Sequence, residues 1–352
     1  MPDISIIKDN KSKHIKFFVI LILLLIVLFF LDLVLGSVKI PIKDVFSILT
    51  TVESSRQEWL TIVIDFRLPK AITAVIAGAA LSVSGLQMQT IFRNPLAGPY
   101  VLGISSGASL GVAILVLGFS SFFTANQLNF MGNWAVVVSA CIGSGLILFF
   151  ILTLSFRISD IMTILILGIL FGSAATAVVS ILQYFSNESM LKAFIVWTMG
   201  SLGSVSHSQL NILLPCIVVG LLISLASTKI LNAMLLGESY AKSMGVNIKT
   251  SRILVFISTS ILAGTITAFC GPIGFIGIAV PHLTRILFKT TNHNFLIPGS
   301  ILMGAIIMLI SDIISRLPGY NTTLPINSVT ALLGIPIVIL IIVRKQKLSS
   351  LM

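Results

Sequence analysis

Long apolar runs separated by short polar loops fill almost the whole chain. Apolar residues make up 56% of its 352 residues and charged residues only 9%, against roughly 25% charged residues in a soluble domain. A helix that crosses a bilayer needs about 20 mostly apolar residues, so the chain holds enough for about ten crossings. The composition excludes a soluble globule, a disordered chain, a coiled coil and a disulfide-stapled secreted domain. The sequence therefore predicts an all-α integral membrane protein with spans at 17–36, 68–90, 99–118, 132–154, 161–184, 207–226, 252–271, 273–288, 296–315 and 327–343.

The N-terminal segment sets the expected orientation. Residues 1–16 are polar and carry four lysines, and the apolar run after them is longer than the 7–15 residues of a signal-peptide core and lacks a small-residue cleavage pattern. We therefore expect a retained first helix with its basic flank in the cytoplasm. An even number of spans then predicts cytoplasmic tails at 1–16 and 346–352 around one membrane domain, 17–345. Most of the 22 Lys and Arg residues fall on the cytoplasmic side of this topology, so the net charge of +11 indicates insertion and not nucleic-acid binding.

The longest internal segment, 227–251, is too polar to span and too patterned for a plain linker. It predicts two short helices, 229–236 and 238–244, hinged near Gly237 and ended by Gly245. From the residues alone it is either a docking element for a partner or a helix pair lying on the bilayer. The longest external segments are 37–66 and 185–206, and the second includes a predicted surface helix at 189–200.

Small and amide residues recur inside the spans. Gly103, Gly107 and Gly111 stand at every fourth position, a pattern typical of close helix packing in membranes. Gln87 and Gln89 either line a polar path or bond to neighbouring helices, and the sequence leaves both interpretations open.

The chain carries no visible energy source of its own. Ionisable residues at the centre of a span usually mark ion coupling, and Asp32, Asp65 and Asp312 all fall near predicted helix ends. No G-x-x-x-x-G-K-[ST] phosphate loop is present, and the scattered His and Cys residues predict no metal site. We therefore expect a transport subunit that is not an enzyme, binds no cofactor and depends on another subunit for energy. An ion-coupled carrier, and an integral-membrane enzyme or structural protein, are the competing hypotheses.

Three basic residues lie where the insertion bias disfavours them. Arg67 and Lys70 stand at the outer start of the second predicted span, and Arg316 at the outer end of the ninth. They either dock an acidic external partner, or reach lipid headgroups, or pair with Asp65 and Asp312.

Several blocks of sequence resemble one family in order and in content. They are RLPKAITAVIAGAALSVSGLQMQTIFRNPLAGPYVLGISSGASLG (67–111), GESYAKSMGVNIKTSR (237–252), GPIGFIGIAVPHLTR (271–285) and LPINSVTALLGIPIVILIIVRK (324–345), together with the W-x-x-G-S-L of 197–202. This pattern is similar to the FecCD family of ABC importer permeases, which carry iron–siderophore complexes, haem or vitamin B12. The resemblance implies a vitamin B12-importer-like fold of ten helices in a bacterial inner or plasma membrane. It also implies a homodimer or heterodimer of permeases, two cytoplasmic ATPase subunits that use the ATP, and an extracytoplasmic substrate-binding protein.

The resemblance also assigns roles to residues. It implies an iron–siderophore complex as the preferred cargo, with haem or a corrinoid as alternatives. Lys70 departs from the arginine that is commoner at its position. By motif, ATPase coupling falls on Gly237, Glu238, Ala241, Gly245 and Val246; binding-protein docking on Arg67, Lys70 and Arg316; an inner gate on Arg93, Asn94, Pro95, Leu96, Ser159 and Asp160; and pathway lining on Gly168, Gly172, Thr176 and Gln183, with Gln87 as a further candidate.

Overall fold

The computed structural model describes residues 4–51, 56–118, 125–158, 160–316 and 323–349, and in these residues all regular secondary structure is helical. The helices are α1 (Ile4–Val34), α2 (Ile42–Thr51), α3 (Gln57–Thr61), η1 (Ile62–Arg67), α4 (Leu68–Ile91), η2 (Pro99–Leu102), α5 (Ile104–Ala113), η3 (Ile114–Gly118), α6 (Ala125–Arg157), α7 (Ile161–Phe185), α8 (Glu188–Thr198), α9 (His207–Ala226), α10 (Thr228–Leu235), α11 (Glu238–Ser243), α12 (Ile248–Cys270), α13 (Ile276–Phe288), α14 (His293–Ser315) and α15 (Ile326–Ser349).

The helices match the predicted spans in number and order. Among the described residues, seven helical segments are long and apolar enough to cross a membrane, and three shorter apolar helices, α5 with η3, α13 and α15, supply the rest. The predicted surface helix is α8. Helix α1 begins at Ile4, so most of the segment expected as an N-terminal tail is helical.

The third predicted span, 99–118, is not one helix. It opens with the 3₁₀ turn η2, and a left-handed Gly103 with φ of 75° separates this turn from α5. Pro99 suits the first turn of a helix because proline has no backbone N–H to donate, and glycine adopts positive φ without a steric cost. The membrane helix therefore begins five residues later than hydropathy predicts.

The eighth predicted span is also shorter than expected. Helix α13 has 13 residues and is about 20 Å long at 1.5 Å per residue, less than the roughly 30 Å of the hydrocarbon core. The loop 271–275 before it is irregular, and its polar groups find partners inside the protein. The Tyr100 hydroxyl donates to the carbonyl of Ile273 at 3.0 Å, and Asn327 Oδ1 accepts from the Gly274 amide at 2.9 Å. Such satisfaction is what permits non-helical backbone at membrane depth.

Helix α4 is the most buried span, and it packs closely on α14. A Cβ added to Gly78 would lie 2.1 Å from the Gly304 carbonyl oxygen, and one added to Gly304 would lie 2.2 Å from that of Gly78. Likewise, a Cβ on Gly107 would lie 2.6 Å from the Gly143 carbonyl oxygen on α6. The glycine faces therefore pack helices against each other, as the sequence predicts.

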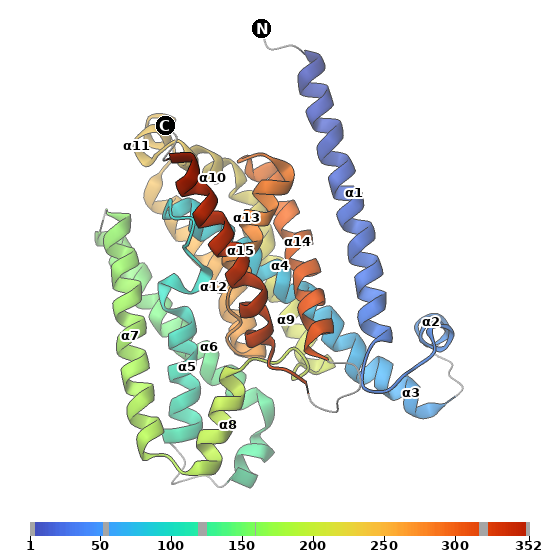
Figure 1. Cartoon of the computed structure of the whole chain (residues 1–352). Coiled ribbons are helices and arrows are strands. Elements are labelled where there is room, and N and C mark those ends of the chain that lie inside the picture. Colours follow the sequence, from blue (N-terminus) through green and yellow to red (C-terminus); the bar gives the residue numbers. More distant parts are fainter. Residues whose placement is uncertain (1–3, 52–55, 119–124, 159, 317–322, 350–352) are drawn as a thin grey trace.

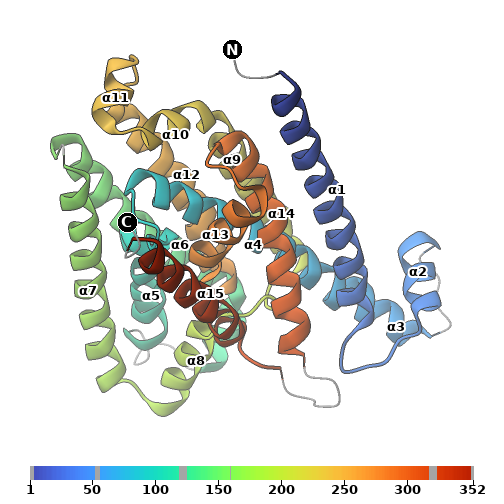
Figure 2. The same ribbon diagram turned by 45° about the horizontal axis from the view of Figure 1, so that its top comes forward.

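The two ends of the bundle differ in what they carry. Helices α10 and α11 lie at the end where α1 begins and α15 finishes, and α3 and α8 lie at the opposite end (Figures 1 and 2). Helix α1 runs along the edge of the bundle beside α14 (Figure 1). Each end, and one groove between them, contains residues that the sequence singled out.

Candidate functional site

Helices α10 and α11 form a compact elbow. Gly237 joins them with φ of 118°, and Gly245 ends α11 with φ of 84°, conformations that glycine adopts readily. The Val246 amide donates to the Ala241 carbonyl at 3.0 Å, and Ala241 is fully buried. The structure thus contains the two helices that the sequence predicts in this segment, with both glycines at the positions where the chain turns.

An ion pair fixes the elbow to the adjacent span. The Arg252 guanidinium on α12 donates to both carboxylate oxygens of Glu238, at 2.5 and 2.6 Å. Arg252 is 3% exposed and Glu238 is 32% exposed. A bidentate pair of this kind is strong and directional, so α11 cannot tilt without either moving α12 or breaking the pair.

Three large apolar side chains are exposed on the surface of the elbow. Leu236, Tyr240 and Met244 are 66%, 52% and 60% exposed, although the segment around them is polar. A groove of about 580 Å³ lies between the elbow and the start of α12, lined among others by Glu238 and Gly245, and these three apolar residues are not part of its lining. Large apolar side chains exposed on a polar segment mark an interaction surface. These three, here called the elbow patch, were not singled out from the sequence, although apolar residues interrupting a polar loop were a visible signal.

The predicted inner-gate turn touches the elbow. Arg93 has φ of 46°, and its Nη2 lies 3.1 Å from where a Cβ on Gly237 would stand. Asn94 Oδ1 accepts from the Leu96 amide at 2.9 Å, and the Pro95 carbonyl accepts from the His282 ring at 2.8 Å. The turn 93–96 is therefore held in a defined shape next to the hinge.

The other part of the predicted inner gate is a helix cap. Asp160 accepts hydrogen bonds from the amides of Met162 and Thr163 at the start of α7. Its bonds with Thr163, from the hydroxyl first and then the amide, hold the pKa of Asp160 below its ordinary value. Ser159 lies outside the described residues.

A shallow groove of about 390 Å³ runs along α7. Gly168, Gly172 and Thr176 line it together with residues of the 100–106 segment. Gln183 lies about two turns beyond Thr176 on α7, is half-buried, and does not line this groove. The structure therefore brings three of the predicted lining residues together and leaves Gln183 apart.

Gln87 is placed elsewhere. Its side chain is fully buried, donates to the Ser258 hydroxyl and accepts from the Thr259 hydroxyl, both at 3.1 Å. Gln89 donates to the Ile278 carbonyl at 3.1 Å. Of the two interpretations of these glutamines, the bond between neighbouring helices is confirmed for both. Gln87 thus bonds to α12, which satisfies its buried amide, and its role in lining the path stays a prediction.

The three outer basic residues lie in one buried cluster. The Lys70 ammonium is 2.8 Å from Asp312 Oδ1, and Arg316 contacts the second oxygen of Asp312 and lies 3.3 Å from Asp32 Oδ2. Arg67 is 5% exposed and donates to three carbonyls around the end of α1. Pairing with Asp312 is therefore confirmed for Lys70 and Arg316. Arg67 bonds to backbone carbonyls instead.

Asp65, the other suggested partner of the basic residues, lies apart from this cluster. It is 55% exposed, and one oxygen of its carboxylate lies 3.9 Å from the His207 ring. The pairing of the outer basic residues with Asp65 was therefore wrong. Their docking role stays a prediction. Lys70 and Arg316 are paired with carboxylates of the chain, and Arg67 is hydrogen-bonded to carbonyls.

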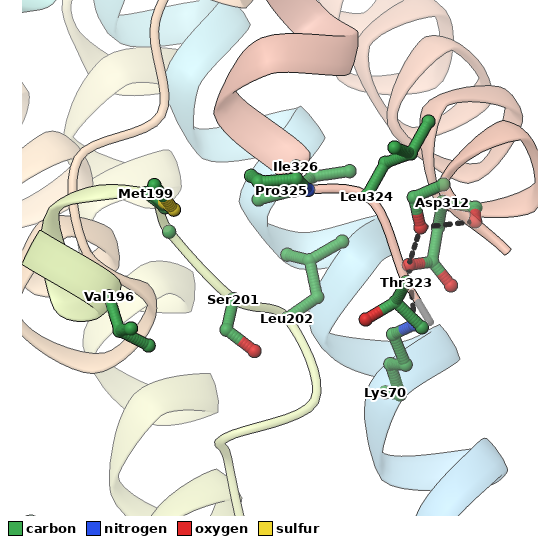
Figure 3. Close-up of a pocket in the computed structure, with 12 residues that line it drawn as sticks. Lys70, Val196, Met199, Ser201, Leu202, Asp312, Thr323, Leu324, Pro325 and Ile326 are labelled. Carbon is green, nitrogen blue, oxygen red and sulfur yellow. Dashed lines mark hydrogen bonds and ion pairs between the residues drawn. The ribbon is translucent and has the colours of Figure 1, made fainter. Parts of the chain in front are cut away.

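The cluster borders a small outer pocket of about 250 Å³ (Figure 3). Lys70 and Asp312 face it from α4 and α14, and Val196 and Met199 line its opposite side (Figure 3). In the described residues no group of three His, Cys, Asp or Glu side chains is arranged to hold a metal ion.

Together these features describe a multi-pass helical membrane protein with a two-helix elbow at one end and a cluster of charged residues at the other. The sequence profile of the FecCD transport family matches residues 24–344, and the chain belongs to this family.

Characterised relatives agree with this assignment over most of the chain. The chain is 35% identical to the hemin transport system permease protein HmuU of Yersinia pestis over 336 residues, 94% of this chain and 96% of the relative. It is 34% identical to the vitamin B12 import system permease protein BtuC of Salmonella typhi over 284 residues, 80% and 84% of the two chains. A solved structure described as an inward-facing conformation of a metal-chelate type ABC transporter superposes with a TM-score of 0.80 at 28% identity, covering 94% of this chain and 99% of that one. The chain is thus a permease of the FecCD transport family, and its relatives include ABC permeases named for hemin and for vitamin B12.

Proposed function

We propose that the chain is the permease subunit of an ATP-driven importer that moves an iron–siderophore complex from an external binding protein to the cytoplasm. The class of cargo is supported by relatives that carry haem or vitamin B12 and by the metal-chelate transporter structure. A haem or corrinoid cargo is the alternative within the same family. The chain supplies the path, and a separate ATPase subunit supplies the energy.

The elbow patch is the observation that carries this proposal. Leu236, Tyr240 and Met244 are exposed together on a polar segment, and the Glu238–Arg252 pair ties that segment to α12. A partner that presses on the patch would therefore move a membrane helix. This arrangement favours docking of a cytoplasmic ATPase over a helix pair resting on lipid, because a resting helix needs no rigid ion pair to a span.

The groove along α7 is the proposed surface of the transport path. Small or hydroxylated residues, Gly168, Gly172, Ser173 and Thr176, line it. Ser173 and Thr176 are exposed in a single chain, whereas the two glycines are buried against the 101–106 segment. We place the second permease subunit against this face, so that the two grooves enclose the path. Small uncharged side chains suit a bulky chelate that a binding protein delivers, because the path then needs little affinity of its own.

The orientation follows from the position of the elbow. With α10 and α11 in the cytoplasm, both ends of the chain lie in the cytoplasm and the outer cluster faces the binding protein. Docking of that protein near Arg67, Lys70 and Arg316 stays part of the proposal. Because these cations already have partners, docking there requires either partial opening of the cluster or contacts to neighbouring exposed residues.

Uptake into proteoliposomes that contain the permease, its ATPase subunit and its binding protein tests the proposal. Ferric siderophore, hemin and cyanocobalamin are offered in parallel, and we expect ATP-dependent accumulation of the ferric siderophore. If hemin or cyanocobalamin alone accumulates, the proposed iron–siderophore cargo is wrong, but the assignment to ATP-driven importers stands. Uptake that an ionophore abolishes, and that an ATPase-dead partner leaves intact, would overturn the class in favour of an ion-coupled carrier.

A pair of variants then tests the elbow patch itself. Tyr240→Glu replaces an exposed aromatic ring of the patch by a charge and should weaken binding of the ATPase subunit by about tenfold or more, since each 1.4 kcal/mol of lost contact is a factor of ten. Tyr184→Glu is the matched control. Tyr184 is 83% exposed and lies at the end of α7 that is farthest from the elbow (Figure 1). Equal ATPase binding by both variants would contradict the docking role.

A further inference from the structure

The elbow reaches a second span through a buried hydrogen-bonded contact. Asn232 of α10 accepts from the His293 backbone amide at 2.8 Å and lies 2.9 Å from His293 Nδ1. Its amide nitrogen donates to Asn292 Oδ1 at 3.0 Å. The first amides of a helix have no partner within that helix, so Asn232 caps the start of α14 from another element.

These contacts determine the roles of the ring atoms. Asn232 Oδ1 must be the acceptor because it receives a backbone N–H, and His293 Nδ1 facing that oxygen must therefore carry a proton and donate. The opposite ring atom, Nε2, lies 2.9 Å from the Thr90 hydroxyl of α4. The His293 ring, which is 1% exposed, thus bridges α10 and α4.

Beyond this point α4 and α14 behave as one body. The Gly78–Gly304 contact brings their backbones together, and the Ser82 hydroxyl on α4 donates to the Ser300 carbonyl on α14 at 2.6 Å. At the far end, the pair of Lys70 and Asp312 joins the same two helices again. Close-packed interfaces shift between discrete arrangements and deform little, so a displacement applied at the start of α14 reaches the outer pocket.

We propose that Asn232 and His293 form the junction through which the elbow moves the α4–α14 body during transport. The inference rests on the proposed function, since the force comes from the ATPase that docks on the elbow. Glu238 and Arg252 connect α11 to α12, and Asn232 and His293 connect α10 to α4 and α14. The elbow therefore drives two parts of the bundle, and transport requires that both move together. Asn232 and His293 are positioning residues that touch no cargo.

The test measures cargo moved per ATP hydrolysed in the reconstituted transporter, with whichever of ferric siderophore, hemin and cyanocobalamin the uptake assay selects. Asn232→Leu keeps the approximate volume but removes both bonds to His293. We expect this ratio to fall at least about fivefold, the lower end of typical coupling between sites, while binding of the ATPase subunit is unchanged. Asn232→Asp keeps the acceptor for the amide and for Nδ1 but loses the donor to Asn292 Oδ1, so it should restore part of the ratio. His293→Leu should reproduce the loss and add little to Asn232→Leu in the double variant.

Ser206→Ala is the matched control. Ser206 caps α9 by accepting from the Gln209 amide, so its loss weakens a helix start without touching the elbow, and the ratio should stay at the wild-type value. An unchanged ratio in Asn232→Leu, or no rescue by Asn232→Asp in folded protein, would overturn the junction alone. Absence of ATP-dependent uptake by the wild-type complex would instead overturn the proposed function and this inference with it.

Discussion

Replacing Asp312 by alanine tests whether charge holds the outer end of the bundle together. Asp312 is 1% exposed and contacts both Lys70 and Arg316. The surrounding cluster contains three cations, Arg67, Lys70 and Arg316, and two carboxylates, Asp32 and Asp312. The substitution leaves three cations facing one carboxylate in a largely buried site.

The expected loss of unfolding free energy depends on which partners Lys70 and Arg316 retain without Asp312. Breaking a buried ion pair by removing one partner costs about 3–5 kcal/mol. Arg316 retains Asp32 and two carbonyls at 3.0 Å, whereas Lys70 loses its carboxylate contact and is 18% exposed. Because Lys70 can turn toward water, we expect the lower end of the range, about 3 kcal/mol.

The assay is equilibrium unfolding of the purified permease in mixed micelles, followed by circular dichroism. Asp65→Ala is the control, since Asp65 is 55% exposed and 3.9 Å from His207, and an exposed pair is worth about 0–1 kcal/mol. If Asp312→Ala and Asp65→Ala lower the unfolding free energy equally, the cluster is not a structural lock. The outer cations would then be available for docking.

Two further predictions concern the helix contact and the elbow. Gly304→Ala should prevent accumulation of folded permease, because the new Cβ would lie 2.2 Å from the carbonyl oxygen of Gly78. Gly145→Ala is the control and should fold normally, because nothing lies within 4 Å of its Cβ position. Equal yields of folded protein from the two variants on a detergent sizing column would refute the close contact. Glu238→Ala and Arg252→Ala should each reduce ATP-dependent uptake and, as partners of one ion pair, should be non-additive in the double variant; additive losses in the uptake rate would show that they act separately.

The sequence predicted the parts of the fold that depend on local composition. Hydropathy found each span because a helix in lipid must be apolar along its whole length. Gly237 and Gly245 marked the elbow because few other residues adopt positive φ at a turn. The predicted boundaries were wrong where tertiary contacts replace helical hydrogen bonds, as at Gly103 and in the loop 271–275, where Tyr100 and Asn327 satisfy the backbone.

The candidate site was predicted less completely, for a related reason. Arg67, Lys70 and Arg316 were found as basic residues in unusual places, but Asp312, the partner of Lys70 and Arg316, was one of several carboxylates at helix ends. The sequence left Gln87 open between two roles, and its partners on α12 are more than 170 residues away. Distances along the chain of this size carry no local signal.

The sequence by itself determined that this is a multi-pass helical membrane protein of the FecCD family with a polar elbow. Apolar runs long enough to cross a bilayer, glycines at turns and the motifs of the family are all recognisable in consecutive residues. Only the tertiary structure decided which polar groups meet: that Asp312 neutralises Lys70 and Arg316, that Asn232 caps a distant helix, and that the elbow presents an apolar surface. The physical reason is that a buried polar group must find a partner wherever the packed helices place one, and the spans that supply those partners are brought together by close packing and not by sequence order.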